Sequence, residues 1–251
     1  SRASVAIYPH CDVDALEALL RSSTARHRLV VTDAVFSMDG DIAPLGALLA
    51  LCERHDALLV VDDAHGIGVL GPEGRGSVHA LGLQSDCIVY MGTLGKAAGL
   101  SGAFVAADQL IIDRLIQRGR PYVFSTATLP ALAHATLTAL ELIRSADTAR
   151  RQLQRHRDRL REFASAWQPF HLLASATPIQ PLVIGDNSTV VRIADALLQE
   201  GLWVPAIRPP TVPAGSARLR ITLSGAHSDE DIGRLGAALS RIISRAGTIP
   251  T

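Results

Sequence analysis

The sequence predicts an α/β protein whose first part is a mostly parallel sheet covered by helices. Short apolar runs typical of buried strands alternate with helical patterns through the first third of the 251 residues. Charged and polar residues follow two of these runs directly, as they do at the ligand-binding edges of open α/β sheets. Long helical patterns begin at Pro130 and lead into a second set of strand and helix signals.

The first third of the chain contains a repeated alternation of strands and helices. Asp12 is placed to cap a helix that has Leu16 and Leu20 on one face. Pro44 opens another helix, which continues to Cys52. The strands that we expect here and in the following segment are 28–32, 57–62, 87–91 and 102–106, and a turn-rich loop covers 36–41.

A change of pattern near residue 145 predicts a domain boundary inside a helical connection. The first domain is then 1–145, and 146–251 forms a smaller α+β domain. The arginine-rich stretch 150–161 is interpreted as a solvated helix face, because acidic residues are interspersed in and beside it. In the second domain we expect strands at 179–184, 203–207 and 218–223 and helices at 188–200 and 228–246.

The composition excludes several classes of protein. Lys plus Arg and Asp plus Glu are equal at 24 each, which gives no electrostatic case for binding nucleic acid or an anionic membrane. Apolar runs stay below the ~18 residues of a membrane span. The three cysteines, Cys11, Cys52 and Cys87, form no CxxC pair, which fits a reducing, cytoplasmic compartment and excludes a cysteine-built zinc site. The chain shows no signal peptide and begins without Met, which is compatible with a fragment.

Two strand-end loops carry most of the chemistry in the sequence. Asp62, Asp63 and His65 follow the first apolar run, and Thr93 and Lys96 follow the next. Pyridoxal 5′-phosphate (PLP) needs an amine for covalent attachment, a carboxylate that keeps its ring nitrogen protonated, and small or hydroxyl residues near its phosphate. These loops supply such groups. Because neighbouring residues of a strand point to opposite faces, only one of the two acids can lie under the ring.

The same loops are compared with three other kinds of structure. Gly95-Lys96 is not a P-loop, because Tyr90 stands where a glycine is needed and Ala97 follows the lysine. Asp62, Asp63 and His65 suit a divalent metal, although no second cluster at ligand spacing supports one. The glycines between 66 and 76 need only form a tight surface loop, with phosphate binding as the weaker alternative.

Four long motifs resemble those of the α-oxoamine synthases, which are fold-type I PLP enzymes. The motifs are TDAVFSMDGDIAPL (32–45), VVDDAHGIGVLGPEGRGS (60–77), GTLGKAAGLSGAF (92–104) and AIRPPTVPAGSARLRITLSGAH (206–227). The resemblance extends from about residue 8 to residue 241 and implies the PLP-dependent transferase fold type I, with 1–145 as the PLP-binding large domain. It also implies a homodimer with shared active sites. The family's N-terminal portion, with a glycine pair and a histidine that stacks on PLP, is not found, so this chain alone is expected to be incomplete as an enzyme.

The resemblance implies a role for each matched residue around the cofactor. Lys96 matches the lysine that attaches PLP, Asp62 the acid facing its ring nitrogen, and His65 the imidazole bonded to its phenolic oxygen. The other cofactor contacts that it implies are Ser37, the phosphate-binding Thr93, and Ser125 and Thr126, which reach the phosphate of the neighbouring subunit.

The resemblance also implies the substrates. Arg220, rather than Arg218, occupies the position of the carboxylate-binding arginine, and Arg208 and Thr211 fall in the loop at the substrate entrance. Residues 206–227 resemble most closely the biotin-pathway member of the family, which condenses L-alanine with a pimeloyl thioester, on coenzyme A or a carrier protein, with loss of CO2. A sibling synthase that uses glycine or serine, a non-catalytic PLP-binding homologue and a metal hydrolase remain as alternatives.

Overall fold

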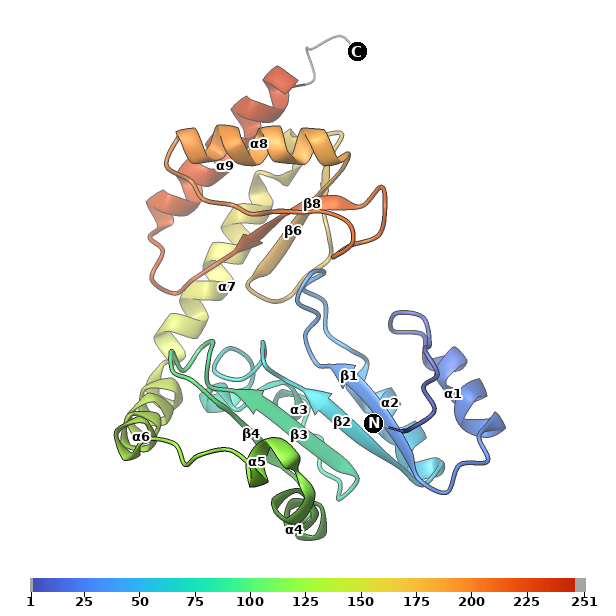
Figure 1. Cartoon of the computed structure of the whole chain (residues 1–251). Coiled ribbons are helices and arrows are strands. Elements are labelled where there is room, and N and C mark those ends of the chain that lie inside the picture. The colour runs from blue at the N-terminus through green and yellow to red at the C-terminus, as the bar shows by residue number, and fades with distance from the viewer. Residues whose placement is uncertain (1, 247–251) are drawn as a thin grey trace. The chain divides into compact units, whose positions relative to one another are not determined.

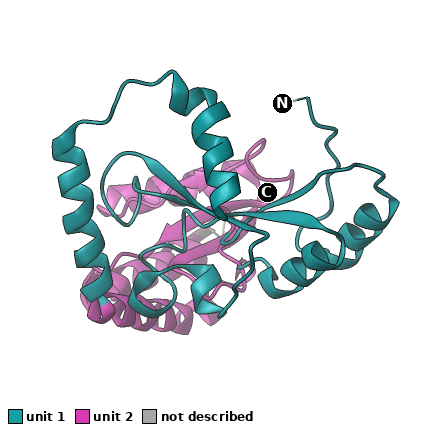
Figure 2. Cartoon of the chain, turned by 90° about the horizontal axis from the view of Figure 1, so that it is seen from below, with its two compact units in different colours: residues 1–35, 42–146 teal, residues 36–41, 147–251 magenta. Residues whose placement is uncertain are grey.

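The protein divides into two compact units. In the computed structural model, residues 2–246 are described. Unit 1 consists of residues 1–35 and 42–146, and unit 2 of residues 36–41 and 147–251 (Figure 2). The boundary in the helical connection lies between Ala146 and Asp147. The short segment 36–41 is grouped with unit 2, whereas the sequence assigned it to the first domain.

Unit 1 is built on a mixed sheet of four strands in the order β1-β2-β3-β4 (Figure 1). The strands are β1 (Arg28–Asp33), β2 (Ala57–Asp62), β3 (Ile88–Thr93) and β4 (Ala103–Ala106). β1 pairs with β2 and β2 with β3 in parallel, and β4 runs antiparallel to β3. The parallel register places Asp33 beside Asp62, so β1, β2 and β3 end at one edge of the sheet.

Helices α1 (Val13–Ser22) and α2 (Leu45–Arg54) form where the sequence patterns expect them. The Asp12 side chain accepts a hydrogen bond from the Ala15 amide at 2.9 Å and so caps α1. α2 packs beside β2 and buries its apolar face, which consists of Leu45, Leu48, Leu49, Leu51 and Cys52. The alternating burial of β2 matches this arrangement, with Leu59 and Val61 fully buried.

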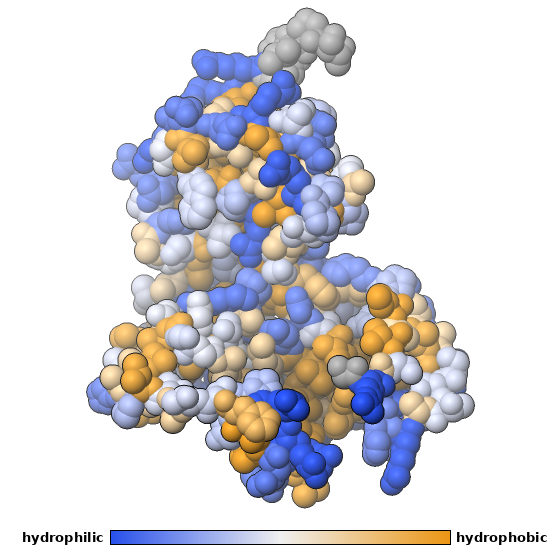
Figure 3. Space-filling model, viewed as in Figure 1, coloured by the Kyte–Doolittle hydropathy of each residue, from blue (hydrophilic) through white to orange (hydrophobic). Residues whose placement is uncertain are grey.

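Other parts of unit 1 leave apolar side chains at the surface (Figure 3). Leu29 and Val31 of β1 are 61% and 63% exposed, so the alternate face of this strand is not covered within the described chain. Helices α4 (Gln109–Arg118), α5 (Arg120–Val123) and α6 (Pro130–Ser145) contain no buried residue. Surface of this kind is typical of a face that packs against another part of a protein.

Unit 2 is an antiparallel sheet with helices and its own core. The sheet order is β5-β6-β8-β7, formed by β5 (His171–Leu172), β6 (Ile179–Gly185), β7 (Ala206–Ile207) and β8 (Ala217–Thr222). The helices are α7 (Asp147–Glu162), α8 (Asn187–Gln199) and α9 (Asp229–Ala246). The fully buried side chains of its core include Trp167, Leu160, Leu182, Leu197, Leu219 and Leu239. Asp186 caps α8 by accepting the Thr189 amide at 2.7 Å.

The predicted α/β class with a mostly parallel sheet in the first part is confirmed. One strand was predicted too long, because β7 contains only Ala206 and Ile207, while Trp203 is 82% exposed. The prediction did not contain α3 (Ser77–Ala80), α4, α5 or β5. The helices described within residues 2–246 all lack the combination of length and apolar character that a bilayer span needs.

Candidate functional site

The candidate site in unit 1 lies where the three parallel strands end. Asp33 ends β1, Asp62 ends β2 and Thr93 ends β3. Asp62 pairs with Met91, two residues before Thr93, so these side chains belong to the same edge of the sheet. The structure therefore brings together the ends of the two strand-end loops that the sequence singled out, as expected for parallel strands.

Asp62 is a half-buried carboxylate at this edge, and Asp33 stands beside it on β1. One oxygen of Asp62 accepts the Ala64 amide at 3.0 Å, which fixes the start of the turn that carries His65. Burial raises the pKa of Asp33, the negative charge of Asp62 raises this pKa further, and the positive charge of Lys96 opposes both effects. The charges of Asp62 and Lys96 thus both act on Asp33 at this edge.

The loop after β3 is closed by hydrogen bonds on both sides of Lys96. The Thr93 hydroxyl donates to the Gly102 carbonyl at 3.2 Å and accepts the Gly95 amide at 3.2 Å. The amide of Leu100 donates to the Leu94 carbonyl at 2.8 Å. Lys96 is exposed on this loop and is the single lysine in the whole sequence. An exposed amine with a carboxylate pair and a hydroxyl nearby is a donor set that fits PLP.

Asp63 is fully buried and serves a different purpose from Asp62. Its carboxylate accepts the Ser77 amide and the Ser77 hydroxyl at 2.6 Å each, and the Tyr90 hydroxyl at 2.9 Å. Burial raises the pKa of Asp63 in spite of these hydrogen bonds, and burial together with the charge of Asp63 raises the pKa of Tyr90. Asp63 is thus an internal anchor that joins the loop after β2 to β3.

The glycine-rich segment that follows His65 folds tightly around this anchor. A Cβ atom on Gly66 would lie 2.0 Å from one oxygen of Asp63, and a Cβ on Gly76 would lie 2.2 Å from the other. Gly76 also has a φ of +94°, which side-chain-bearing residues rarely adopt. The expectation of a tight loop was correct, but these two glycines pack against a buried carboxylate and not against solvent.

The alternative of a metal site formed by Asp62, Asp63 and His65 conflicts with these hydrogen bonds. Both oxygens of Asp63 are directed at hydrogen-bond donors inside unit 1. A metal ligand would have to present an oxygen lone pair to the ion alongside its neighbours. Asp63 therefore cannot complete such a site without losing its internal partners, and the metal-hydrolase interpretation is not supported.

Ser125 and Thr126 lie in an exposed segment between α5 and α6. The Ser125 hydroxyl donates to the Pro121 carbonyl at the start of α5. Their implied contact with the phosphate of a neighbouring subunit stays a prediction.

Four predicted site residues belong to unit 2. Ser37 lies in the turn 36–41, and its carbonyl accepts a hydrogen bond from Arg220 Nε at 2.5 Å. Burial lowers the pKa of Arg220. Arg208 and Thr211 are exposed at opposite ends of one turn, in which the Thr211 amide donates to the Arg208 carbonyl at 3.0 Å. Their roles at a substrate entrance stay predictions.

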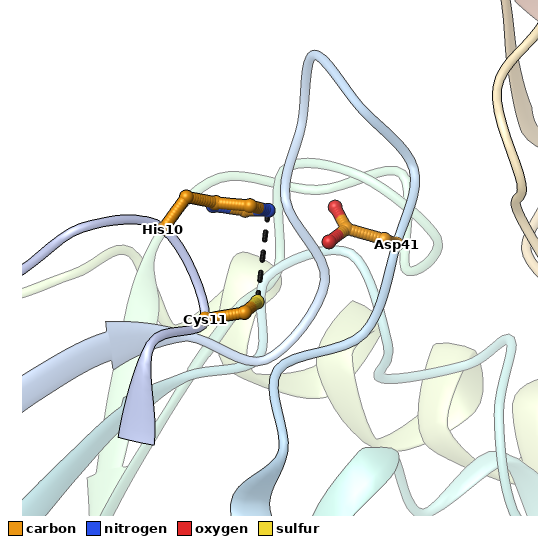
Figure 4. Close-up of side chains that lie close together, drawn as sticks. All are labelled: His10, Cys11 and Asp41. Atoms are coloured by element: carbon orange, nitrogen blue, oxygen red, sulfur yellow. Dashed lines mark hydrogen bonds between the residues drawn. The ribbon is translucent and has the colours of Figure 1, made fainter. Parts of the chain in front are cut away.

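The three cysteines are free thiols of unit 1. Cys11 Sγ lies 3.6 Å from His10 Nε2, as Figure 4 shows. Burial raises the pKa of the Cys52 thiol to about 12, so this side chain stays protonated and packs as a small apolar group.

Comparison with known proteins identifies the family. A model of the aminotransferase class I and II family matches residues 1–239. The chain belongs to this family. It is 55% identical over 248 residues to the 8-amino-7-oxononanoate synthase of Janthinobacterium sp. (strain Marseille), a match that covers 96% of this chain and 62% of that protein. The chain thus spans about 62% of the length of this curated relative.

Solved structures of the same fold support the family assignment. The serine palmitoyltransferase of Sphingomonas wittichii has a TM-score of 0.89 and 32% sequence identity, over 96% of this chain and 61% of that chain. A structure described as SPT with bound PLP has a TM-score of 0.89 and 30% identity, over 96% of this chain and 61% of that chain. The PLP-enzyme fold type expected from the sequence motifs is therefore confirmed, and the relatives named above agree with the resemblance.

The sequence interpretation of the site missed Asp33 and the partners of Asp63. Asp33 follows the apolar run of β1 in the same way that Asp62 follows that of β2, so strand-end position was a usable signal. No such signal existed for Asp63, because Ser77 and Tyr90 are 14 and 27 residues away in the sequence.

The Asp63 anchor makes a prediction about stability. Tyr90→Phe removes one donor from a buried carboxylate, so we expect the free energy of unfolding to fall by about 1–3 kcal/mol. Equilibrium urea unfolding measures this change. Tyr122→Phe is the matched control, because Tyr122 is 69% exposed. An equal effect of the two substitutions would show that Asp63 does not depend on the Tyr90 hydroxyl.

Proposed function

We propose that this chain carries the catalytic lysine and acid of a PLP-dependent 8-amino-7-oxononanoate synthase. The reaction is the decarboxylative condensation of L-alanine with a pimeloyl thioester, an early step of biotin synthesis. The observation that carries the proposal is the placement of Lys96, the single lysine, on the loop after β3, at the same sheet edge as Asp62. The 55% identity to a synthase of this name supports the choice within the family.

PLP, when bound, would draw off the negative charge that develops at the α-carbon of the amino acid. Lys96 would hold the cofactor covalently, and its released amine would then move the proton at that α-carbon. Asp62 would hold a proton at the ring nitrogen through its negative charge, and His65 would donate to the phenolic oxygen. Thr93 would bind the phosphate with its hydroxyl, which would then donate to the phosphate in place of the Gly102 carbonyl.

The residues of unit 2 would bind and orient the amino acid. Arg220 would hold the carboxylate of L-alanine, because a guanidinium can make two parallel hydrogen bonds to it. Orientation of this carboxylate decides which bond at the α-carbon breaks. Ser37 would contact the cofactor, and Arg208 and Thr211 would line the entrance for the acyl thioester.

The assembly and the location of the enzyme are also proposals. The synthase would act as a cytoplasmic homodimer in which Ser125 and Thr126 reach the phosphate in the partner subunit. Their exposure between α5 and α6 is compatible with that role. A sibling synthase that uses glycine or serine, such as one of the 2-amino-3-ketobutyrate ligase or 5-aminolevulinate synthase type, is the second candidate. Product formation from alanine, compared with that from glycine or serine, separates this candidate from the proposed synthase.

The covalent role of Lys96 gives a direct test. Borohydride reduction in the presence of PLP should label one internal peptide, the one that contains Lys96. Lys96→Ala should remove this label, and Lys96→Arg should do the same while it keeps the positive charge, because a guanidinium does not form the covalent linkage. Peptide mapping by mass spectrometry measures the label. An internal label that persists in both variants would overturn the assignment.

We expect substitution of Asp62 to affect turnover and substitution of Asp63 to affect stability. In the enzyme extended to the length of the relatives, Asp62→Asn removes the charge opposite the ring nitrogen, so we expect turnover to fall by about 10²-fold or more with little change in stability. Asp63→Asn should instead lower the urea midpoint, because an amide cannot accept all three internal hydrogen bonds. Asp86→Asn is the exposed control. Equal losses of turnover at unchanged stability for Asp62→Asn and Asp63→Asn would contradict this division.

The length of the relatives leads to a third prediction. The resemblance implies that an N-terminal portion contributes a glycine pair and a stacking histidine to the PLP pocket. Extending the chain at its N-terminus to the length of the relatives should therefore tighten PLP binding by a few orders of magnitude, since each 1.4 kcal/mol is tenfold. Titration of PLP absorbance measures this change. Full synthase activity of the 251 residues alone would show that the additional portion is dispensable.

A further inference from the structure

The turn 36–41 is held by unit 2, although it connects β1 to α2 in the sequence. Inside the turn, the Gly40 amide donates to the Phe36 carbonyl at 2.8 Å, and the Phe36 amide donates to the Asp41 carbonyl at 3.0 Å. The turn is therefore a compact element, and a group that fixes one part of it restrains the rest, including Ser37.

Gly40, at the tip of this turn, packs against the start of β6 and the residues just before it. The hydroxyls of Ser175 and Thr177 both donate to the Gly40 carbonyl, at 2.7 Å and 2.9 Å. A Cβ on Gly40 would lie 2.3 Å from the Ile179 carbonyl oxygen, and Gly40 has a φ of +72°. Only glycine fits this close approach of two backbone segments. The tip is thus fixed by contacts that do not involve the arginines of β8.

Arg218 fixes the middle of the turn, and all nitrogens of its guanidinium donate hydrogen bonds within unit 2. Its side chain is 5% exposed, and Nη1 donates to Asp39 Oδ1 at 2.5 Å and to the Met38 carbonyl at 3.2 Å. Nε donates to the Ser216 carbonyl at 3.0 Å, and Nη2 donates to the Ser216 hydroxyl at 3.2 Å. Every nitrogen of this guanidinium has an acceptor in unit 2, so Arg218 is not available to a substrate carboxylate.

Arg220 lies two residues further along β8, on the same face of the strand, and is only partly occupied. Nε donates to the Ser37 carbonyl at 2.5 Å, and Nη1 donates to the Thr222 hydroxyl at 3.1 Å. Nη2 has no hydrogen-bond partner among the residues that the structure describes. The Ser37 carbonyl therefore sets the plane of the Arg220 guanidinium and leaves its Nη2 side for a ligand.

We propose that Arg218 is a positioning residue for carboxylate recognition by Arg220. Arg218 fixes Met38 and Asp39, the neighbouring Ser37 carbonyl is held in place with them, and this carbonyl orients the Arg220 guanidinium. This inference rests on the proposed function, in which Arg220 receives the carboxylate of the amino acid. A planar guanidinium makes two hydrogen bonds to a carboxylate only in the correct orientation. If the turn 36–41 shifts and the Ser37 carbonyl changes its direction, carboxylate binding should weaken although every residue that contacts the carboxylate is still present.

The first arm of the test measures the turn itself and does not depend on the proposed function. Arg218→Met keeps the length and apolar stem of the side chain and removes its donors. We expect amide hydrogen exchange in residues 36–41 to become at least about tenfold faster, while exchange in the core of α8 stays unchanged. Arg241→Met is the matched control, because Arg241 makes its ion pair with Glu200 at 2.6 Å, away from the turn. Unchanged exchange in 36–41 would overturn the proposal.

The second arm measures carboxylate binding in the PLP-loaded enzyme, extended at its N-terminus to the length of the relatives. L-Alanine and L-alaninamide, which lacks the carboxylate, are titrated by the absorbance change of bound PLP. Arg218→Met should raise the Kd of alanine about tenfold and that of alaninamide less than about twofold, and Arg220→Lys should show the same selectivity. Asp39→Asn should weaken alanine binding in the same way, and its effect should not add to that of Arg218→Met, since the two residues form one pair.

The outcomes separate this proposal from the proposed function. If the wild-type enzyme binds alanine and Arg218→Met binds it equally tightly, the positioning role is wrong and the proposed function stands. An equal loss of affinity for alanine and alaninamide would indicate general loosening of unit 2 and would also overturn the role. If the wild-type enzyme shows no response to alanine, the proposed function is wrong, and the exchange arm alone then decides whether Arg218 fixes the turn.

Discussion

The buried carboxylate of Asp63 is the constraint on which the strand-end site of unit 1 depends. A carboxylate can be buried only if donors replace the water that it loses, and Asp63 obtains three from Ser77 and Tyr90. Tyr90 lies on β3 and Ser77 begins α3, so these hydrogen bonds close the loop after β2 back onto the sheet. Because Asp63 is directed inward, the adjacent Asp62 is left at the carboxyl edge with one oxygen on the Ala64 amide. The position of Asp62 thus follows from the anchoring of its neighbour.

In unit 2, Arg218 and Arg220 of β8 differ in the same way as Asp63 and Asp62 do. Every nitrogen of the Arg218 guanidinium donates to an acceptor of unit 2. Arg220 donates to two acceptors and retains further donors. Sequence spacing places both on one face and cannot distinguish them. The distinction depends on burial and on the turn 36–41, which is remote from β8 in the sequence. In each pair, Asp62 with Asp63 and Arg220 with Arg218, the first residue keeps some capacity for hydrogen bonds. The second uses its capacity on groups of its own unit.

The sequence predicted those parts of the fold that depend on local pattern. β2 was predictable because an apolar run of strand length ends in an acid, and α1 because Asp12 precedes a helical apolar pattern. β7 was predicted too long because Trp203 suggests a strand, while its side chain is exposed and only Ala206 and Ile207 pair with β8. α4 was missed although a local signal was present, because its apolar residues lie on one side of the helix as clearly as those of α1 do, and Asp108 caps its start.

The use of arginine in place of lysine elsewhere makes the chemistry of Lys96 unusually selective. The chain has 24 basic residues of the Lys and Arg types, and a single one of them is lysine. A guanidinium has a pKa above about 12 and keeps its proton, so it supplies positive charge without a nucleophilic amine. An aldehyde cofactor that enters this chain therefore meets one internal amine with which it can form a covalent linkage. That amine stands on a loop closed by Thr93, within the electrostatic influence of the acids at the ends of β1 and β2. Under the proposed function, the selectivity of covalent attachment thus comes from composition, and the acids at the sheet edge would direct the later proton movements.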